Sequence, residues 1–199
     1  MCGRFAITLP NDAMAQLFAA QPANDLPDTP NYNICPTNAV HSVLAGEHGR
    51  RLISMRWGFL PHWYKSASDG PLLINARAET LAQKPAFAEA CRVRRCLIPA
   101  TGYYEWTKDP AGKRLPWYFQ RSDQAPIAFA GIWQDWGEDP LRTCAIVTTA
   151  TNNSLGHLHH RLPLMLEPRD WPLWLGEGGK GAATLMQPAP EGQHQFHRV

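Results

Sequence analysis

The sequence lacks the features that mark membrane-spanning and secreted proteins. No run of about 18 consecutive apolar residues occurs, so no transmembrane helix is predicted. The N-terminus has no basic region followed by an apolar stretch, which argues against a secretory signal. Internal repeats and long linkers are also absent. With 199 residues, 44% of them hydrophobic, the chain suits one well-packed domain.

Cysteine is scarce, and its spacing does not suggest a disulfide framework. The chain has five cysteines, an odd number, and none form a CxxC pair. A reduced, cytoplasmic protein is therefore expected. The net charge of +2 neither requires nor excludes a nucleic-acid partner. The runs Arg50–Arg51 and Arg92–Arg94–Arg95 are candidate positive clusters, although both also suit an ordinary solvated surface.

Frequent turn residues divide the chain into short elements, because its 18 prolines and 15 glycines are spread along the whole length. Apolar spacing predicts short helices over residues 11–20, 76–83, 84–92, 152–159 and 167–176. Apolar runs predict strands over residues 39–46, 51–60, 95–100, 102–107, 114–121, 126–134, 142–151 and 162–166. We therefore expect an α+β fold with a strand-rich, barrel-like antiparallel sheet core and a few short helices. One domain spans residues 1–199, with about 177–199 as a C-terminal tail on the surface.

The chain begins MCGRF, which places a cysteine directly behind the initiator. Methionine aminopeptidase removes Met1 when the next side chain is small, so the mature chain is expected to begin with Cys2. Its α-amine and thiol have ordinary pKa values of about 8 and about 8.5, and both supply some nucleophile near neutrality. A buried, inert cysteine is the alternative. Gly3 permits an unusual backbone, and Phe5 with Ile7 suits an edge strand that anchors the end.

The segment LLINARAET places polar residues where a strand gives way to a helix. Asn75 either caps that helix or donates its amide to an oxyanion, a thiol or an amine. Arg77 has the planar fork that suits phosphate. Glu79 pairs with Arg77 or lies at the helix N-terminus.

The segment GYYEWT carries a carboxylate among aromatic residues. In a strand, Tyr103 and Glu105 point one way, and Tyr104 and Trp106 point the other. Glu105 is then either solvated or held in a partly apolar pocket. In such a pocket its pKa rises, which suits a general acid or base.

The segment GHLHHRLPLML contains three histidines, His157, His159 and His160. They invite a metal site, but HxHH matches no recognised zinc pattern. A single histidine that carries protons near neutral pH is the preferred interpretation.

Taken in order, these segments resemble the SOS-response-associated peptidase family, whose domain is abbreviated SRAP. The matching motifs, which extend over nearly the whole chain, are MCGRF, YNICPT, RWGFLPHW, INARAET, GYYEW, IVTTAT and HHRLP. The resemblance implies a single-domain sensor of abasic sites in single-stranded DNA that forms a covalent protein–DNA crosslink.

The resemblance also implies catalytic roles for particular residues. Cys2 is the crosslinking residue, Asn75 supplies the amide that positions it, and Glu105 transfers protons. The family's histidine stands four residues before the proline of H-x-R-x-P, which identifies His159 here. His160 occupies a position where relatives frequently have an acidic residue.

The DNA contacts follow from the same resemblance. Arg4 and Arg77 match phosphate-contacting arginines, and Trp57 with Gly58 lies in a loop like the base-stacking wedge. Thr148 or Thr149 contacts the DNA backbone. The expected partner is single-stranded DNA containing abasic sites, with no cofactor, no metal and no membrane. A monomer is expected, cytoplasmic and nucleoid-associated when bound to DNA.

An amine and a thiol on adjacent carbons give the terminal cysteine a chemical purpose. The ring-opened abasic site is an aldehyde, which condenses with the amine to an imine. Sulfur can then close a five-membered thiazolidine, a step favoured by proximity. Glu105 and His159 are suited to the proton transfers. Strand scission by a lyase route could compete at the imine.

Two other functions remain open from the sequence. One is an N-terminal-nucleophile cysteine peptidase at Cys2, limited in its simplest form to removal of Met1. The other is a metal or nucleic-acid binding module that uses His157, His159 and His160. Only covalent DNA capture requires arginines and an aromatic wedge around Cys2.

Overall fold

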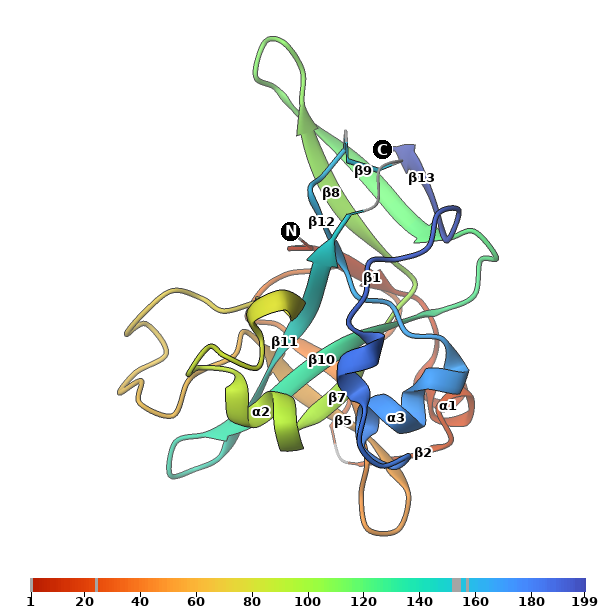
Figure 1. The fold of residues 1–199 in the computed structure, drawn as a ribbon. Helices are drawn as coiled ribbons and strands as arrows, with labels where there is room; N and C mark the ends of the chain where they lie inside the picture. The colour runs from red at the N-terminus through yellow and green to blue at the C-terminus, as the bar shows by residue number, and fades with distance from the viewer. Residues whose placement is uncertain (1, 24, 152–154, 157) are drawn as a thin grey trace.

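The fold consists of two strand-rich sheets with a few short helices at their edges (Figure 1). The computed structural model describes residues 2–23, 25–151, 155–156 and 158–199. Met1, whose removal is predicted, and His157, considered in the alternative of a metal-binding module, therefore fall outside the described residues.

Five strands close into a barrel. They are β4 (Ala39–Leu44), β5 (Arg50–Trp57), β7 (Arg95–Ala100), β10 (Ile127–Trp136) and β11 (Leu141–Ala150). Antiparallel pairs join them in the order β11–β10–β7–β4–β5, and β5 then pairs with β11, Trp57 opposite Cys144. This confirms the predicted α+β fold with a barrel-like core. The closing β5–β11 pair is parallel, so the barrel is not wholly antiparallel.

A second, antiparallel sheet carries the N-terminus. Its order is β13 (His194–Arg198), β9 (Arg114–Arg121), β8 (Gly102–Lys108), β1 (Phe5–Ile7) and β3 (Asn31–Ile34). The strand expected at Phe5 to Ile7 is internal rather than an edge, because β1 pairs with both β8 and β3. Phe5 and Tyr103 point from this sheet onto Phe129 of β10, and each ring centroid lies 5.9 Å from that of Phe129. These aromatic contacts pack the second sheet against the barrel.

Short elements complete the structure. The helices are α1 (Asn11–Leu17), α2 (Ala88–Val93) and α3 (Trp171–Leu175), with 3-10 turns η1 (Ala78–Thr80), η2 (Pro168–Asp170) and η3 (Ala182–Leu185). The remaining strands are β2 (Ala20–Pro22), β6 (Asn75–Arg77) and β12 (Arg161–Pro163). Within the described ranges, no helix has the length and apolar character needed to cross a membrane.

Two predicted elements differ from the structure because long-range pairing overrides the local pattern. The helix predicted over 76–83 is instead β6 followed by η1, since residues 75–77 pair in parallel with β11. The predicted surface tail, 177–199, includes β13, which pairs with β9. The helix predicted over 152–159 lies partly outside the described residues, and its residues 155, 156 and 158 form turns.

Three of the five arginines in the candidate positive clusters are engaged inside the fold. Arg50 pairs with Glu177 at 2.8 Å, and Arg94 pairs with Glu89 at 2.9 Å. Arg95 donates to backbone carbonyls of α2 and α3. Arg51 and Arg92 remain exposed, so each run contributes one exposed arginine and not a cluster of free ones.

Gly102, at the start of β8, leaves no room for a side chain. A Cβ there would lie 2.3 Å from Cζ of Tyr118 and 2.6 Å from the carbonyl oxygen of Phe119. That carbonyl belongs to the paired backbone of β9 and cannot simply rotate away. We expect Gly102→Ala to lower the free energy of unfolding by about 1–3 kcal/mol, measured by urea denaturation.

Gly178→Ala is the matched control for this variant, because its Cβ would meet neighbours at ordinary distances of 3.4 Å or more. Equal losses of stability in the two variants would contradict the steric argument.

Candidate active site

The N-terminal segment runs along β8, and Cys2 is buried at its end. The backbone N–H of Tyr104 donates to the carbonyl of Arg4 at 2.8 Å, which extends the β1–β8 pairing toward the terminus. The side-chain amide of Asn75 donates to the carbonyl of Cys2 at 2.9 Å. Cys2 itself has no exposed surface. Strand pairing and one amide thus fix a chain end that would otherwise fray.

Asn75 reaches Cys2 from β6, which also carries the exposed Arg77. This strand pairs with β11, Asn75 opposite Ile146 and Arg77 opposite Thr148. Residues two apart on a strand point the same way, so both side chains lie on one side of β6. Asn75 therefore does not cap a helix. Its Oδ1 is buried without a hydrogen-bond partner among the described residues, which leaves one acceptor for a ligand.

The surroundings of the Cys2 thiol keep it protonated. Burial raises the pKa of this thiol far above its usual range, and the nearby Glu105 carboxylate raises it further. The thiolate is therefore rare at neutral pH. A reaction at this sulfur needs a neighbouring group that takes its proton.

Glu105 and His159 form a pair that can serve as that group. Nε2 of His159 lies 3.8 Å from Oε2 of Glu105. Burial raises the pKa of Glu105 to about 7, whereas burial lowers the pKa of His159 below its ordinary value. Burial therefore increases the proton affinity of the carboxylate and decreases that of the imidazole. Up to about pH 7 the carboxyl group can hold a proton beside a neutral imidazole.

The backbone of Arg161 orients the His159 ring. Nδ1 of His159 lies 2.8 Å from the carbonyl oxygen of Arg161 and 3.0 Å from its backbone nitrogen. A protonated Nδ1 can donate to the carbonyl, and an unprotonated one can accept from the N–H. His160 stacks on the same ring, with centroids 4.5 Å apart. Both tautomers of His159 are therefore accommodated while Nε2 stays directed toward Glu105.

A partly buried ion pair supports this turn, and the sequence analysis missed it. Nη1 and Nη2 of Arg161 donate to the two carboxylate oxygens of Glu79 at 2.8 and 2.9 Å. The same guanidinium donates to the carbonyl and hydroxyl of Thr148. Glu79 thus pairs with Arg161 and not with Arg77, which is exposed and makes no ion pair with a described residue. The arginine in HHRLP could have suggested an ion pair. Nothing in the sequence indicated that its partner is Glu79, 82 positions away.

A pocket of about 480 Å³ lies beside the N-terminal segment. Its lining residues are Gly3, Arg4, Glu105, Trp106, Arg114 and His159. The Cζ atoms of Arg4 and Arg114 lie 6.0 and 5.2 Å from the centroid of the Trp106 ring. Arg4 also donates to Oδ1 of Asn33 at 2.6 Å. Such a cationic and aromatic lining suits an anionic ligand.

The predicted base-stacking residue is not accessible. Trp57 has no exposed surface, and its indole N–H donates to the carbonyl of Ile74 at 3.0 Å. The prediction that Trp57 stacks on a base is therefore wrong, because neither face of its ring is open. Gly58 follows at a φ of +136°, a conformation that favours glycine. The exposed aromatic residue of the same RWGFLPHW motif is Trp63.

The two predicted threonines are also buried. Thr148 has no exposed surface, and its hydroxyl accepts from Arg161. Thr149 is 2% exposed, and the contact of Thr148 or Thr149 with the DNA backbone stays a prediction. Of the predicted phosphate contacts, Arg4 lines the pocket and Arg77 is exposed.

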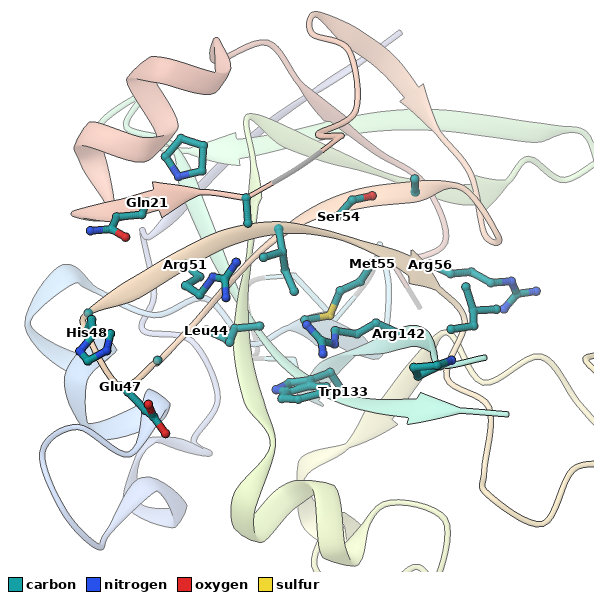
Figure 2. A pocket seen from close by; sticks show the side chains of 18 of the residues that line it. Gln21, Leu44, Glu47, His48, Arg51, Ser54, Met55, Arg56, Trp133 and Arg142 are labelled. Carbon is teal, nitrogen blue, oxygen red and sulfur yellow. The ribbon is translucent and has the colours of Figure 1, made fainter. Parts of the chain in front are cut away.

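A larger hollow, of about 960 Å³, lies elsewhere between β5 and the β10–β11 pair. Figure 2 shows Leu44, Met55 and Trp133 pointing into it, with Arg51 and Arg142 nearby. No cysteine lines it, and its β11 residues, 141 and 142, lie at the opposite end of that strand from Thr148. Of these two pockets, only the smaller one is lined by Glu105 and His159.

The part of the chain that the structure describes contains no group of three or more histidine, cysteine, aspartate or glutamate residues placed to hold a metal ion. All five cysteines are free thiols.

The raised pKa of Glu105 predicts a pH-dependent stability difference. The unfolded chain ionises this carboxyl group near its ordinary pKa, and the folded protein does so only at about 7. As pH rises through this window the wild-type protein loses stability, and Glu105→Gln does not. The free energy of unfolding of the variant minus that of the wild type should grow by about 3 kcal/mol between pH 4 and pH 8.

Urea denaturation at each pH measures this difference. Glu138→Gln, at an exposed position, controls for loss of one negative charge. A difference between Glu105→Gln and wild type that does not change with pH would contradict the prediction.

Comparison with known proteins identifies the family. The profile of "SOS response associated peptidase (SRAP)" matches residues 1–199. The chain is 34% identical over 181 residues to abasic site processing protein YoqW of Bacillus subtilis, which covers 88% of this chain and 80% of that protein. It is 32% identical over 209 residues to abasic site processing protein YedK of Escherichia coli, which covers 100% and 92%.

A crystal structure of a protein from Bacteroides thetaiotaomicron, 24% identical in sequence, has the same fold, with a TM-score of 0.87 over 100% of this chain and 92% of that one. The fold, the profile and the relatives agree, and the chain belongs to the SRAP family.

Proposed function

We propose that this protein processes abasic sites in single-stranded DNA by bonding covalently to them through Cys2. One observation carries the proposal: Asn75 holds the backbone of Cys2 while the buried thiol adjoins the Glu105–His159 pair. The names of the relatives YoqW and YedK, abasic site processing proteins, support the same substrate. Removal of Met1 comes first, because only a free amine on Cys2 can condense with an aldehyde.

The reaction begins at C1′ of the ring-opened abasic sugar. The Cys2 amine adds to this aldehyde carbon, and the carbonyl oxygen takes up the amine's proton to give a carbinolamine. Its hydroxyl leaves as water with a proton from the Glu105 carboxyl group, which forms an iminium carbon. The Cys2 sulfur adds to that carbon, and the thiol proton returns to the Glu105 carboxylate directly or through His159. The products are a thiazolidine and one water molecule.

The geometry favours this order of steps. A thiol with a raised pKa is a weak nucleophile on its own, so the amine reacts first. Once the imine has formed, sulfur and carbon belong to one molecule and ring closure gains a large effective concentration. Oδ1 of Asn75 offers an acceptor for the carbinolamine or for a sugar hydroxyl.

The same argument weighs against a cysteine peptidase as the main activity. Catalytic thiols of peptidases have lowered pKa values, because the thiolate is the attacking species. Here burial and Glu105 act in the opposite direction. A limited removal of Met1 by the protein itself, and a lyase reaction at the imine, remain compatible with the site.

Crosslinking is the first test. Wild-type protein, with a free Cys2 verified by mass, should give a shifted band with single-stranded DNA containing one abasic site on a denaturing gel. Cys2→Ala should give none. Cys35→Ser is the matched control, because it removes a more exposed thiol and leaves the terminal one. The absence of a band for the wild type would overturn the proposal and favour the peptidase.

The pH dependence of the crosslinking rate tests the role of Glu105. Dehydration needs a protonated carboxyl group, which is lost above about pH 7, and a neutral amine, which appears toward about pH 8. The rate should therefore peak between these values. Glu105→Gln should be about 100-fold slower and should lose the decline on the alkaline side. An unchanged bell-shaped profile in this variant would assign the proton transfer to another group.

A further inference from the structure

The outer face of the second sheet carries a row of aromatic side chains, here called the aromatic platform: Tyr32, Tyr104, Trp106 and Tyr118. The ring centroid of Tyr104 lies 5.0 Å from that of Tyr118 and 6.3 Å from that of Trp106. The opposite face of β8, with Tyr103 and Glu105, packs into the core. The platform is therefore additional to the hydrophobic core and not part of it.

The platform is held in place by contacts of its own. The hydroxyl of Tyr104 donates to the carbonyl of Tyr32 at 3.0 Å. The ring of Tyr118 lies directly over Gly102, where no side chain intervenes. Tyr32 remains 64% exposed, and Tyr104, Trp106 and Tyr118 are half-buried. The Tyr104 and Tyr118 rings, fixed in this way and partly open to solvent, can accept planar groups with little further loss of side-chain entropy.

Positive charge borders the platform. Arg4 and Arg114 approach the Trp106 ring, and neither makes an ion pair with a described residue. The turn between β8 and β9 adds Lys108 and Lys113, with Asp109 as its one acidic residue. In Figure 1 this hairpin projects from the body of the protein beside the N-terminus. The charge of this border is therefore complementary to a polyanion.

The platform is continuous with the candidate active site. Arg4, Trp106 and Arg114 line the Glu105–His159 pocket and also border the platform. A strand whose abasic sugar enters the pocket passes these side chains, and Trp106 leads from the pocket onto the exposed rings.

We propose that the single-stranded DNA on one side of the lesion crosses the aromatic platform, with its bases stacked on the rings and its phosphates beside Arg4 and Arg114. This rests on the proposed function for the identity of the strand. The planes of Tyr104 and its two neighbours are tilted by 35° and 52°, so these rings do not stack face to face and each keeps surface that a base can contact. Bases in a duplex already stack on each other, and the platform therefore selects unpaired DNA.

Binding without crosslinking separates this proposal from the chemistry. In a Cys2→Ala background, the dissociation constant for undamaged single-stranded DNA is measured by fluorescence anisotropy at fixed salt. Tyr104→Leu and Tyr32→Ala should each weaken binding about 10-fold, the effect of losing one stacked base. Trp133→Leu, an aromatic residue beside Arg142 in the larger hollow, is the matched control and should leave the constant unchanged.

Two further experiments separate the contribution of base stacking from that of charge. Replacing the bases of one flank by abasic spacers, with phosphates retained, should weaken wild-type binding and should not weaken Tyr104→Leu further. Arg114→Gln should reduce the slope of log affinity against log salt by about 1. Each variant must unfold at the wild-type urea midpoint.

Unchanged affinity in Tyr104→Leu and Tyr32→Ala, with normal folding, would overturn the platform, as would spacers without effect on either flank. If the wild-type protein forms no crosslink, while Tyr104→Leu and Tyr32→Ala still weaken binding of undamaged single-stranded DNA, the proposed function is overturned and the platform is not. Crosslinking that is normal at saturating DNA in Tyr104→Leu would agree with both, since Tyr104 does not line the reactive pocket.

Discussion

Burial of the chain end, which the proposed function requires to react, is the constraint on which the rest of this structure depends. A terminus ordinarily frays, because few contacts hold it. Here β1 pairs on both sides, the β1–β8 ladder continues to Arg4, and Asn75 holds the carbonyl of Cys2. The second sheet thus fixes the position of one residue at the end of the chain. Its packing on the barrel through Phe5 and Tyr103 transmits the stability of the core to that residue.

The same burial sets the chemistry of the groups around Cys2. Loss of water disfavours the charged form of each group, so it raises the pKa of Glu105 and lowers that of His159. Inside the pocket the carboxyl group therefore stays protonated up to about pH 7, and the imidazole stays neutral at lower pH than in water. The Arg161–Glu79 pair contributes by fixing the turn that carries His159. Burial and position act together, and neither alone would make this pair a proton shuttle.

The sequence predicted the parts of the site that depend on short-range pattern. Strand alternation in GYYEWT correctly separated Tyr103 and Glu105 from Tyr104 and Trp106. The barrel-like core followed from the density of strands. What could not be predicted depends on contacts between distant residues. The β6–β11 pairing turned an expected helix into a strand, and burial removed Trp57 from the surface. Neither pairing partner nor burial depth is encoded in a local motif.

Alternation along β8 places reaction and recognition on the two faces of a single strand. Glu105 faces the core, and Trp106 faces solvent, so a slip of one residue would exchange them. Two contacts oppose such a slip: the Tyr104 N–H bonded to the Arg4 carbonyl, and the Tyr118 ring seated over Gly102. The first also positions Cys2, and the second also positions the platform. Register of β8 is therefore a common requirement for the pocket and for the aromatic face, and a shift of that register would disturb both.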